Sequence, residues 1–301
     1  MEFHLCVLLY FVILFTGSEG DPYFNDLEKL DLPNGHEVNW MKSIDDETLI
    51  SAVTIPGTCQ SMKMNTLDQH QAWTVTQQFT AGVRFFDISL DNSVVKDGSL
   101  TRRKFADVME KMRERLIAHP HEVILIRLTP ENGKAEKEIE KFIQGNDNVW
   151  KDKKVPKMKE VRGKIVLVQS SKFSKGLPVD LHVGGKEFKD KHSGKYMEAI
   201  YDHLKAAENA GDHIVVTETS AYFGLRKSSK NAAVKINPML HKYIDNQLHA
   251  KKPKGLGVIV MDYPGIDLVQ KIIDFNPKSE GSPESSPEEV ENPPETDGEP
   301  E

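Results

Sequence analysis

The sequence predicts an α/β fold in which parallel strands form a barrel or a wound sheet. Apolar, β-rich runs recur along the chain, and segments with helical periodicity lie between them. Such alternation is typical of parallel strands joined by helices. Several runs are almost continuously apolar, as in strands that are covered on both faces. The part expected to fold, residues 21–276, has the length of one barrel or one large α/β domain.

The predicted strands are spread over the whole of this domain. They are Leu49–Ile55, Val83–Leu90, Val123–Leu128, Ile165–Gln169, Ile214–Thr217 and Val258–Met261. The first of them leads into Pro56-Gly57. We expect this dipeptide to form a turn that presents the next side chains at the mouth of a pocket.

Four segments between the strands have the pattern of helices. In Phe105–Ala118, apolar residues recur along one helical face. Lys134–Phe142 and Tyr196–Ala207 show similar patterns. The fourth, Pro238–Leu248, is expected to begin with Asn237 as its N-cap, since proline is favoured in the first helical turn.

The first 20 residues predict a secretory signal peptide. Residues 5–15 form an apolar run, and small and polar residues follow it up to Gly20. This pattern favours cleavage near Gly20–Asp21 and a secreted, extracellular protein. The alternative is an uncleaved anchor, for which the run is short.

Residues 277–301 predict an acidic, proline-rich tail that is disordered. The tail holds nine acidic residues, six prolines and a single aliphatic residue, Val290. Such a segment buries too little surface to offset its ordering entropy. We favour a solubilising role, and the alternative is a segment that binds a partner or masks the protein's own surface.

Cysteine usage predicts a fold without an internal disulfide. The chain has two cysteines, Cys6 and Cys59, and Cys6 lies in the predicted signal peptide. The mature protein would therefore keep one unpaired thiol. We expect Cys59 to be a small apolar filler at the barrel rim, the alternative being a redox-sensitive or bridging thiol.

Polar side chains lie within or after the predicted strands, and barrels of parallel strands carry their chemistry at the strand C-termini. They are Cys59, Gln60, Arg84, Asp87, Asp97, Thr129, Glu131, Gln169, Ser170, Glu218, Thr219, Ser220, Tyr222, Asp262 and Tyr263. The set contains an arginine, several carboxylates and a thiol, but no histidine. It predicts a polar pocket for an anion or a polyol.

Several other classes of site lack their signals. No nucleic-acid-binding motif is present, and Gly184-Gly185-Lys186 lacks the spacing of a phosphate-binding loop. No cofactor and no metal ion are expected. Gln60 and Asp87 would each offer an oxygen to calcium, but Ser89 and Thr129 are poor ligands for the remaining positions.

Six short motifs follow one another along residues 39–275. They are Asn39-Trp40-Met41, Ile55-Pro56-Gly57-Thr58, Gly82-Val83-Arg84-Phe85-Phe86-Asp87-Ile88, Arg162-Gly163-Lys164-Ile165-Val166-Leu167, Ile236-Asn237-Pro238 and Val260-Met261-Asp262-Tyr263. In this order they resemble the X-domain of phosphatidylinositol-specific phospholipase C, in its compact bacterial-type form. The resemblance implies a distorted TIM barrel and a phosphoric diester hydrolase of lipid metabolism.

The same resemblance implies a mechanism for cleaving the phosphodiester between inositol and diacylglycerol. One histidine takes the proton from the inositol 2-hydroxyl, and a second histidine protonates the leaving oxygen. An arginine, or calcium in the eukaryotic enzymes, stabilises the phosphate. A carboxylate near the last strand orients the first histidine.

Several of the positions that this mechanism uses are altered in the present chain. By resemblance, Arg84 matches the phosphate-binding arginine and Asp262 the orienting carboxylate. Cys59 stands at the first histidine position, and Gln60 stands where its aspartate neighbour would be. Asp97 stands at the second histidine position. No complete catalytic set is therefore expected.

We expect the altered site to bind a ligand without turning it over, as a pseudoenzyme. The ligand would be an inositol phosphate or a phosphoinositide head group, and a peripheral membrane contact fits such a ligand. By resemblance and position, the binding residues would be Arg84, Asp87, Thr129, Gln169, Tyr222 and Asp262.

Other interpretations stay open. Arg84 would pair with Asp87 or Asp262 if its role were structural, and Tyr222 would either stack on a sugar ring or simply pack. The chain would be a structural or interaction protein if the acidic tail were its functional part.

An active phosphodiesterase with a base other than histidine is the main alternative. It would need an ionised Cys59 thiol and an Asp97 whose pKa is raised enough for the carboxyl to act as an acid. Neither His70 nor the pair His119 and His121 falls at a motif position that would replace the lost histidines.

Overall fold

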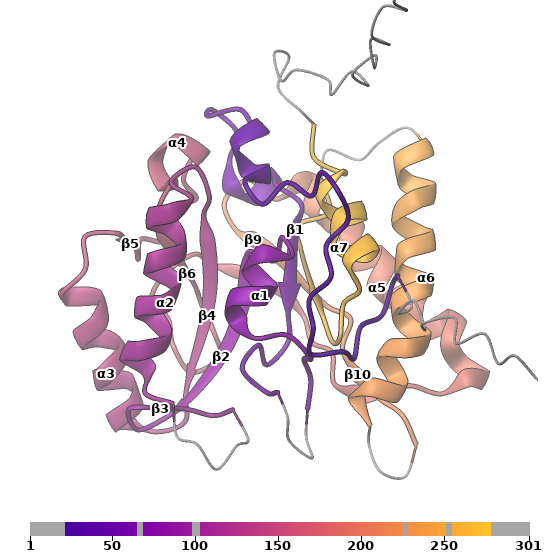
Figure 1. Cartoon of the computed structure of the whole chain (residues 1–301), viewed down its shortest axis with the longest axis horizontal. Coiled ribbons are helices and arrows are strands. Elements are labelled where there is room, and N and C mark those ends of the chain that lie inside the picture. Colours follow the sequence, from indigo (N-terminus) through magenta and orange to yellow (C-terminus); the bar gives the residue numbers. More distant parts are fainter. Residues whose placement is uncertain (1–21, 65–68, 98–102, 225–227, 251–254, 278–301) are drawn as a thin grey trace, which may run out of the picture.

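The computed structural model describes residues 22–64, 69–97, 103–224, 228–250 and 255–277. They form a curled sheet of parallel strands flanked by helices (Figure 1). The strand order is β5-β6-β4-β2-β1-β11-β9-β7, and β3 pairs with β2 outside this path. The predicted α/β fold is confirmed, in the form of a half-barrel.

The strands along this path pair in parallel, and only the short β2–β3 pair is antiparallel. The strands are β1 Ile55–Thr58, β2 Phe85–Asp91, β3 Val94–Val95, β4 Ile124–Pro130, β5 Val149–Trp150, β6 Ile165–Val168, β7 Val179–His182, β9 Ile214–Glu218 and β11 Val258–Met261, with β8 Lys186–Glu187 and β10 Ala221–Tyr222 in a separate pair. Strands β1, β6, β9 and β11 are buried along their whole length. Because the strands run in the same direction, their carboxyl ends meet at one end of the half-barrel, which we call the mouth.

The helices are amphipathic and pack against the strands. They are α1 Val75–Thr80, α2 Phe105–Ala118, α3 Gly133–Gln144, α4 Met158–Val161, α5 Ser193–Ala206, α6 Ser229–His249 and α7 Ile266–Ile273, with short 3-10 helices η1 Trp40–Ser43, η2 Ile50–Ala52, η3 Asp190–His192 and η4 Ala207–Asn209. Helix α3 contacts β4, α5 contacts β9, and α7 contacts β1. Figure 1 shows α2 and α3 at one side of the molecule and α5 and α6 at the other.

Five of the six predicted strands are confirmed to within two residues at each end, and the first is wrong. Helix η2 occupies Ile50–Ala52, and β1 begins only at Ile55. Pro56-Gly57 is therefore part of a central strand and not a turn. A Cβ at Gly57 would lie 2.9 Å from Cβ of Phe85, so glycine at this position lets β1 and β2 approach each other.

Three of the four predicted helices are confirmed, and the fourth begins nine residues earlier than expected. Helix α6 begins at Ser229, and the hydroxyl of Ser228 caps it by accepting a hydrogen bond from the Asn231 amide. Asn237 is not an N-cap. It is buried within the helix, and its Nδ2 donates to the backbone oxygens of Asp262 and Tyr263 at 3.1 Å. It thereby fixes the segment that follows β11.

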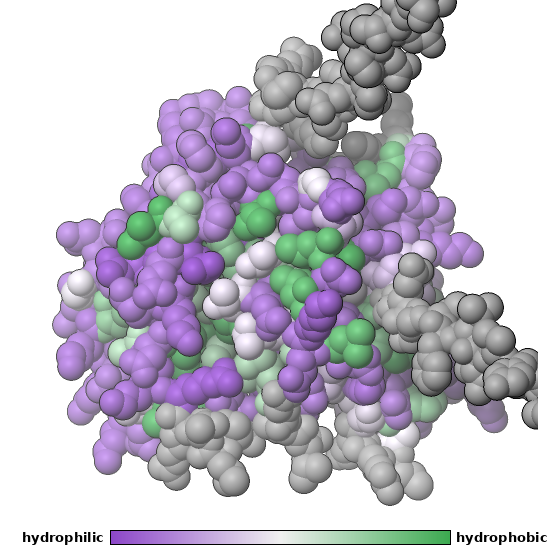
Figure 2. Space-filling view, viewed as in Figure 1, coloured by the Kyte–Doolittle hydropathy of each residue, from purple (hydrophilic) through white to green (hydrophobic). Residues whose placement is uncertain are grey.

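The predicted signal peptide and, apart from Pro277, the predicted tail lie outside the described residues. Within the described ranges, no helix combines the length and apolarity needed to cross a bilayer. Figure 2 shows a largely hydrophilic face with scattered hydrophobic residues.

Arg84 lies at the end of the half-barrel opposite the mouth, because it directly precedes β2. Its side chain is fully buried, and its Nε is 2.8 Å from Oε2 of Glu122. Its terminal nitrogens donate to the backbone oxygens of Phe79, Val83 and Val38. The assignment of Arg84 to phosphate binding is therefore wrong, because its donors are occupied and no solvent reaches it.

Glu122→Gln removes the charge that faces the Arg84 guanidinium and nearly keeps the shape of the side chain. We expect it to lower the free energy of unfolding by about 3–5 kcal/mol, because a buried charge is left without its partner. Urea denaturation followed by circular dichroism measures this change. Glu110→Gln, in the exposed pair with Arg113, is the control and should leave the midpoint unchanged. Equal midpoints for Glu122→Gln and the native protein would contradict the structural role of the buried pair.

Candidate functional site

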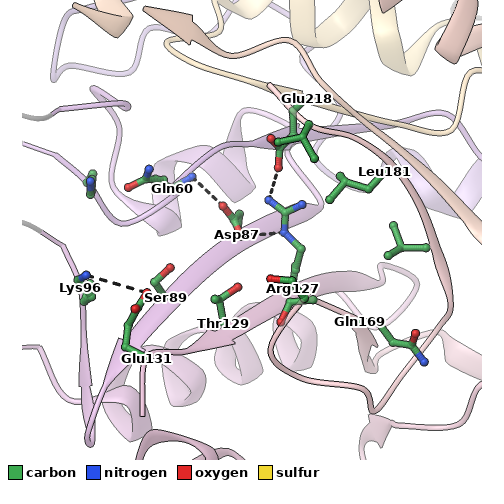
Figure 3. A pocket seen from close by; sticks show the side chains of 15 residues that line it. Gln60, Asp87, Ser89, Lys96, Arg127, Thr129, Glu131, Gln169, Leu181 and Glu218 are labelled. Atoms are coloured by element: carbon green, nitrogen blue, oxygen red, sulfur yellow. Dashed lines mark hydrogen bonds and ion pairs between the residues drawn. The ribbon is translucent and has the colours of Figure 1, made fainter. Parts of the chain in front are cut away.

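Two adjacent cavities open at the mouth, with volumes of about 430 Å³ and 360 Å³. Gln60, Asp87 and Glu218 line both, so the cavities are two halves of one site. Figure 3 shows the first cavity, which is also lined by Ser89, Lys96, Arg127, Thr129, Glu131 and Gln169. The second is also lined by Cys59, His70, Tyr222 and Asp262.

Arg127 lies in β4 and joins the two sides of the mouth (Figure 3). Its Nε donates to Asp87 Oδ1 at 2.9 Å, and its Nη2 donates to Glu218 Oε1 at 2.5 Å. Burial acts to lower the pKa of Arg127, but the two carboxylates outweigh it and hold the pKa above its ordinary value. Glu218 also accepts from the Gly184 amide, and Asp87 from the Gln60 amide.

The guanidinium at the mouth is therefore Arg127 and not Arg84. Arg127 was not among the predicted site residues. A signal was present, since an arginine in the apolar strand Ile124–Pro130 is expected to pair with buried carboxylates. Its register supports this reading, since Arg127 pairs with Asp87 across β2 and β4. The alternative in which Arg84 pairs with Asp87 or Asp262 is also wrong, because Arg84 pairs with Glu122.

His70 lies at the mouth beside Asp262. Its Nδ1 is 2.9 Å from Asp262 Oδ1, and its side chain is 14% exposed against 2% for the aspartate. The backbone holds the imidazole in place, since the His70 amide donates to the Lys63 carbonyl and the Tyr263 amide donates to the His70 carbonyl. The expectation that the mouth holds no histidine is therefore wrong.

The loop between β1 and α1 brings His70 to this place. Gln71, the next residue, is buried, and its Nε2 donates to the backbone oxygens of Cys59 and Met261 at 2.8 and 3.0 Å. These bonds fasten the loop across the ends of β1 and β11. The sequence did not indicate His70 as a site residue, because it is 11 residues beyond Cys59 and does not follow a predicted strand directly.

Cys59 follows β1 and is 7% exposed. Burial raises the pKa of its thiol well above the ordinary value, and the carboxylates of Asp262, Asp87 and Glu218 raise it further. The thiol is therefore protonated at neutral pH and is no base. Its sulfur, a nitrogen of His70 and an oxygen of Asp262 all lie within 4.8 Å of one another, so this group could hold a metal ion.

Asp97 is buried and lies 3.4 Å from the Nε of Arg103. It lines neither of the two cavities. The structure therefore does not bring it to the place expected of a leaving-group acid, because the segment after β3 turns Asp97 toward Arg103.

The structure gathers the remaining predicted binding residues at the mouth. Asp87, Thr129 and Gln169 line the first cavity, and Tyr222 and Asp262 line the second. The Gln169 amide is already used locally, since its Nε2 donates to the carbonyls of Ser174 and Gly176.

The chain is similar to bacterial phosphodiesterases. No family model matches it. It is 28% identical over 309 residues to 1-phosphatidylinositol phosphodiesterase of Listeria monocytogenes, covering 90% of this chain and 95% of the relative. It is 26% identical over 299 residues to the Staphylococcus aureus (strain Newman) protein of the same name, covering 79% and 94%.

Solved structures share the fold. Phosphatidylinositol-specific phospholipase C from Listeria monocytogenes superposes with a TM-score of 0.69 at 24% identity, over 80% of this chain and 100% of that one. A mutant of the Staphylococcus aureus phospholipase gives 0.65 at 22% identity, over 80% and 98%. The distorted TIM barrel is confirmed, and the resemblance to bacterial phospholipases of this type is supported.

The buried, protonated state of Cys59 predicts slow alkylation. At pH 7.5 in EDTA, we expect iodoacetamide to modify Cys59 at least about tenfold more slowly than a free cysteine, because only the thiolate reacts. Peptide mass spectrometry separates Cys59 from Cys6. Urea should restore the ordinary rate, and an equal rate in the folded protein would show that the thiol is accessible and that its pKa is not raised.

Proposed function

We propose that this chain is a phosphodiesterase of the phosphatidylinositol-specific phospholipase C type, with His70 as its general base. The supporting observation is the contact of 2.9 Å between His70 Nδ1 and Asp262 Oδ1 at the mouth of the half-barrel. By resemblance, Asp262 matches the carboxylate that orients a catalytic histidine. The imidazole that it meets here comes from a different position in the chain.

The geometry suits proton transfer from a substrate hydroxyl. Asp262 holds Nδ1, so Nε2 is the ring nitrogen that takes the proton from the inositol 2-hydroxyl. Asp262 also stabilises the imidazolium that forms. The hydroxyl oxygen then attacks phosphorus, and the bond from phosphorus to the diacylglycerol oxygen breaks.

Positive charge in the first cavity supports binding of the phosphate. Arg127 lines it with N–H groups beyond those that hold Asp87 and Glu218, since a guanidinium has five. Lys63 and Lys96 line the same cavity. With Arg127 they set three positive charges against the three carboxylates of the cavity, Asp87, Glu131 and Glu218, and either ammonium would serve as the leaving-group acid.

A non-catalytic head-group-binding protein is the second candidate. The observation in its favour is Cys59, buried at the position of the missing histidine, together with Asp97 outside both cavities. In this case the mouth binds an inositol phosphate and releases it unchanged.

We propose a peripheral membrane contact for either candidate function, catalytic or non-catalytic. Phosphatidylinositol-specific phospholipase C of Staphylococcus aureus, which shares this fold, binds membranes, and this binding can be modulated. In the present chain, Val183 is 57% exposed and lines the first cavity. We propose that this side chain contacts the lipid surface.

His70→Ala should lower turnover of phosphatidylinositol by at least about 100-fold, because a positioned general base contributes roughly that much. Release of inositol phosphate from mixed micelles, measured in EDTA, tests this. His213→Ala is the matched control, since His213 also pairs with a neighbouring carboxylate, Asp212, on the surface. It should leave turnover unchanged.

The same assay decides between the candidates. Turnover that is equal in His70→Ala and the native protein would rule out His70 as the base. Saturable binding of inositol 1-phosphate by the native protein, with no turnover, would establish the non-catalytic candidate.

We also propose that the chain is secreted and cleaved after Gly20. Expression of the full chain in a eukaryotic cell line should deliver it to the medium with Asp21 as its first residue, as intact-mass spectrometry measures. Deletion of residues 2–20 should keep the protein inside the cells. Recovery of the full chain in the membrane fraction would favour the uncleaved anchor.

A further inference from the structure

Cys59, His70 and Asp262 bring three different metal-ligating groups together at the mouth. The Cys59 sulfur, one His70 nitrogen and one Asp262 oxygen lie within 4.8 Å of one another. They come from three segments, namely the end of β1, the loop that follows it and the end of β11. Cys59 and Asp262 are buried, and His70 is half-buried. The three side chains line the second cavity, so a solvent molecule or a ligand can reach them.

The donor set selects zinc. Thiolate and imidazole are ligands of Zn²⁺, whereas calcium and magnesium require oxygen. Zinc bonds of about 2.0–2.3 Å in a tetrahedron place ligand atoms roughly 3.3–3.8 Å apart. The three ligand atoms lie within 4.8 Å of one another, so no separation is more than about 1 Å beyond this range, and changes in side-chain torsions can adjust them to it.

The charge around the group favours a cation. Asp87, Glu218 and Asp262 contribute three carboxylates to the second cavity. Arg127 pairs with Asp87 and Glu218, and His70 lies 2.9 Å from Asp262. Carboxylates attract a divalent ion strongly in a region where burial keeps the effective dielectric low.

The backbone around the ligands is held rigidly. Gln71 ties the Cys59 carbonyl to the end of β11, and Asn237 ties the Asp262 carbonyl to α6. The residues that follow two of the ligands, Gln60 and Tyr263, have φ angles of 42° and 45°. This left-handed conformation is costly for a side chain as large as tyrosine, and such strain is retained where it positions a functional group.

We propose that Cys59, His70 and Asp262 bind a Zn²⁺ ion whose fourth position faces the second cavity. On binding, the thiol releases its proton to solvent and the sulfur coordinates the metal. The bound ion coordinates the His70 imidazole, so the ring can no longer accept a proton from a substrate. If the proposed function is correct, zinc therefore inhibits turnover, and this consequence alone rests on that proposal.

Cobalt(II) is the probe for the site, because it occupies zinc sites and is coloured. Added to the EDTA-treated full chain after removal of the chelator, one equivalent should give a thiolate-to-cobalt charge-transfer band and the intense visible bands of tetrahedral cobalt. Zn²⁺ should abolish both. Absence of these bands in the native protein would overturn the proposal.

Matched variants locate the metal. Cys59→Ser should remove the charge-transfer band, and Asp262→Asn should weaken cobalt binding by more than about 100-fold. Cys6→Ser and His213→Ala should behave as the native protein. Near-ultraviolet circular dichroism checks that each variant is folded. A charge-transfer band that survives in folded Cys59→Ser, or disappears in Cys6→Ser, would contradict the assignment.

Turnover separates this proposal from the proposed function. Cobalt bands without turnover under any condition would support the metal site and reject His70 as a working base. Turnover in EDTA without cobalt bands would reject the metal site alone. Turnover in EDTA that stoichiometric zinc abolishes once the chelator has been removed would support both.

Discussion

The mouth of the half-barrel depends on one buried guanidinium. Arg127 contacts Asp87 on β2 and Glu218 at the end of β9, which lie on opposite sides of the opening. Without it, two carboxylates would face each other in a region of low dielectric, and either repulsion or protonation would follow. Arg127 therefore holds the two sides of the mouth together, and it lines the first cavity.

The helices and strands could be predicted because burial of one or both faces leaves a periodic pattern of apolar residues in the sequence. Strands covered on both faces are continuously apolar, and Phe105–Ala118 buries one stripe of side chains, so both kinds of element are visible in the sequence. Strand β1 could not be recognised from the sequence. Ile55-Pro56-Gly57-Thr58 has the composition of a turn, and only its close approach to Phe85 explains why glycine lies in a central strand.

The site was predicted less well, because its geometry depends on contacts that are distant in sequence. His70 and Asp262 are 192 residues apart, and no local pattern connects them. Arg84 was placed at the wrong end. A residue that precedes a strand lies opposite the mouth, whereas Asp87, Thr129, Gln169 and Asp262, which are in or after strands, were assigned to the mouth correctly.

The half-barrel has a seam. Strands β6 and β7 lie near each other without pairing, and Leu177 bridges them through hydrogen bonds to Leu167 and Gln169. Beyond that bridge, the first cavity is walled by residues on either side, Ser170 and Leu181. At this place no strand ladder joins β6 to β7 in the described part of the chain, whereas ladder hydrogen bonds connect the neighbouring strands from β6 through β4 and β2 to β7. If the proposed function is correct, a bulky lipid product would have a lateral exit at this seam.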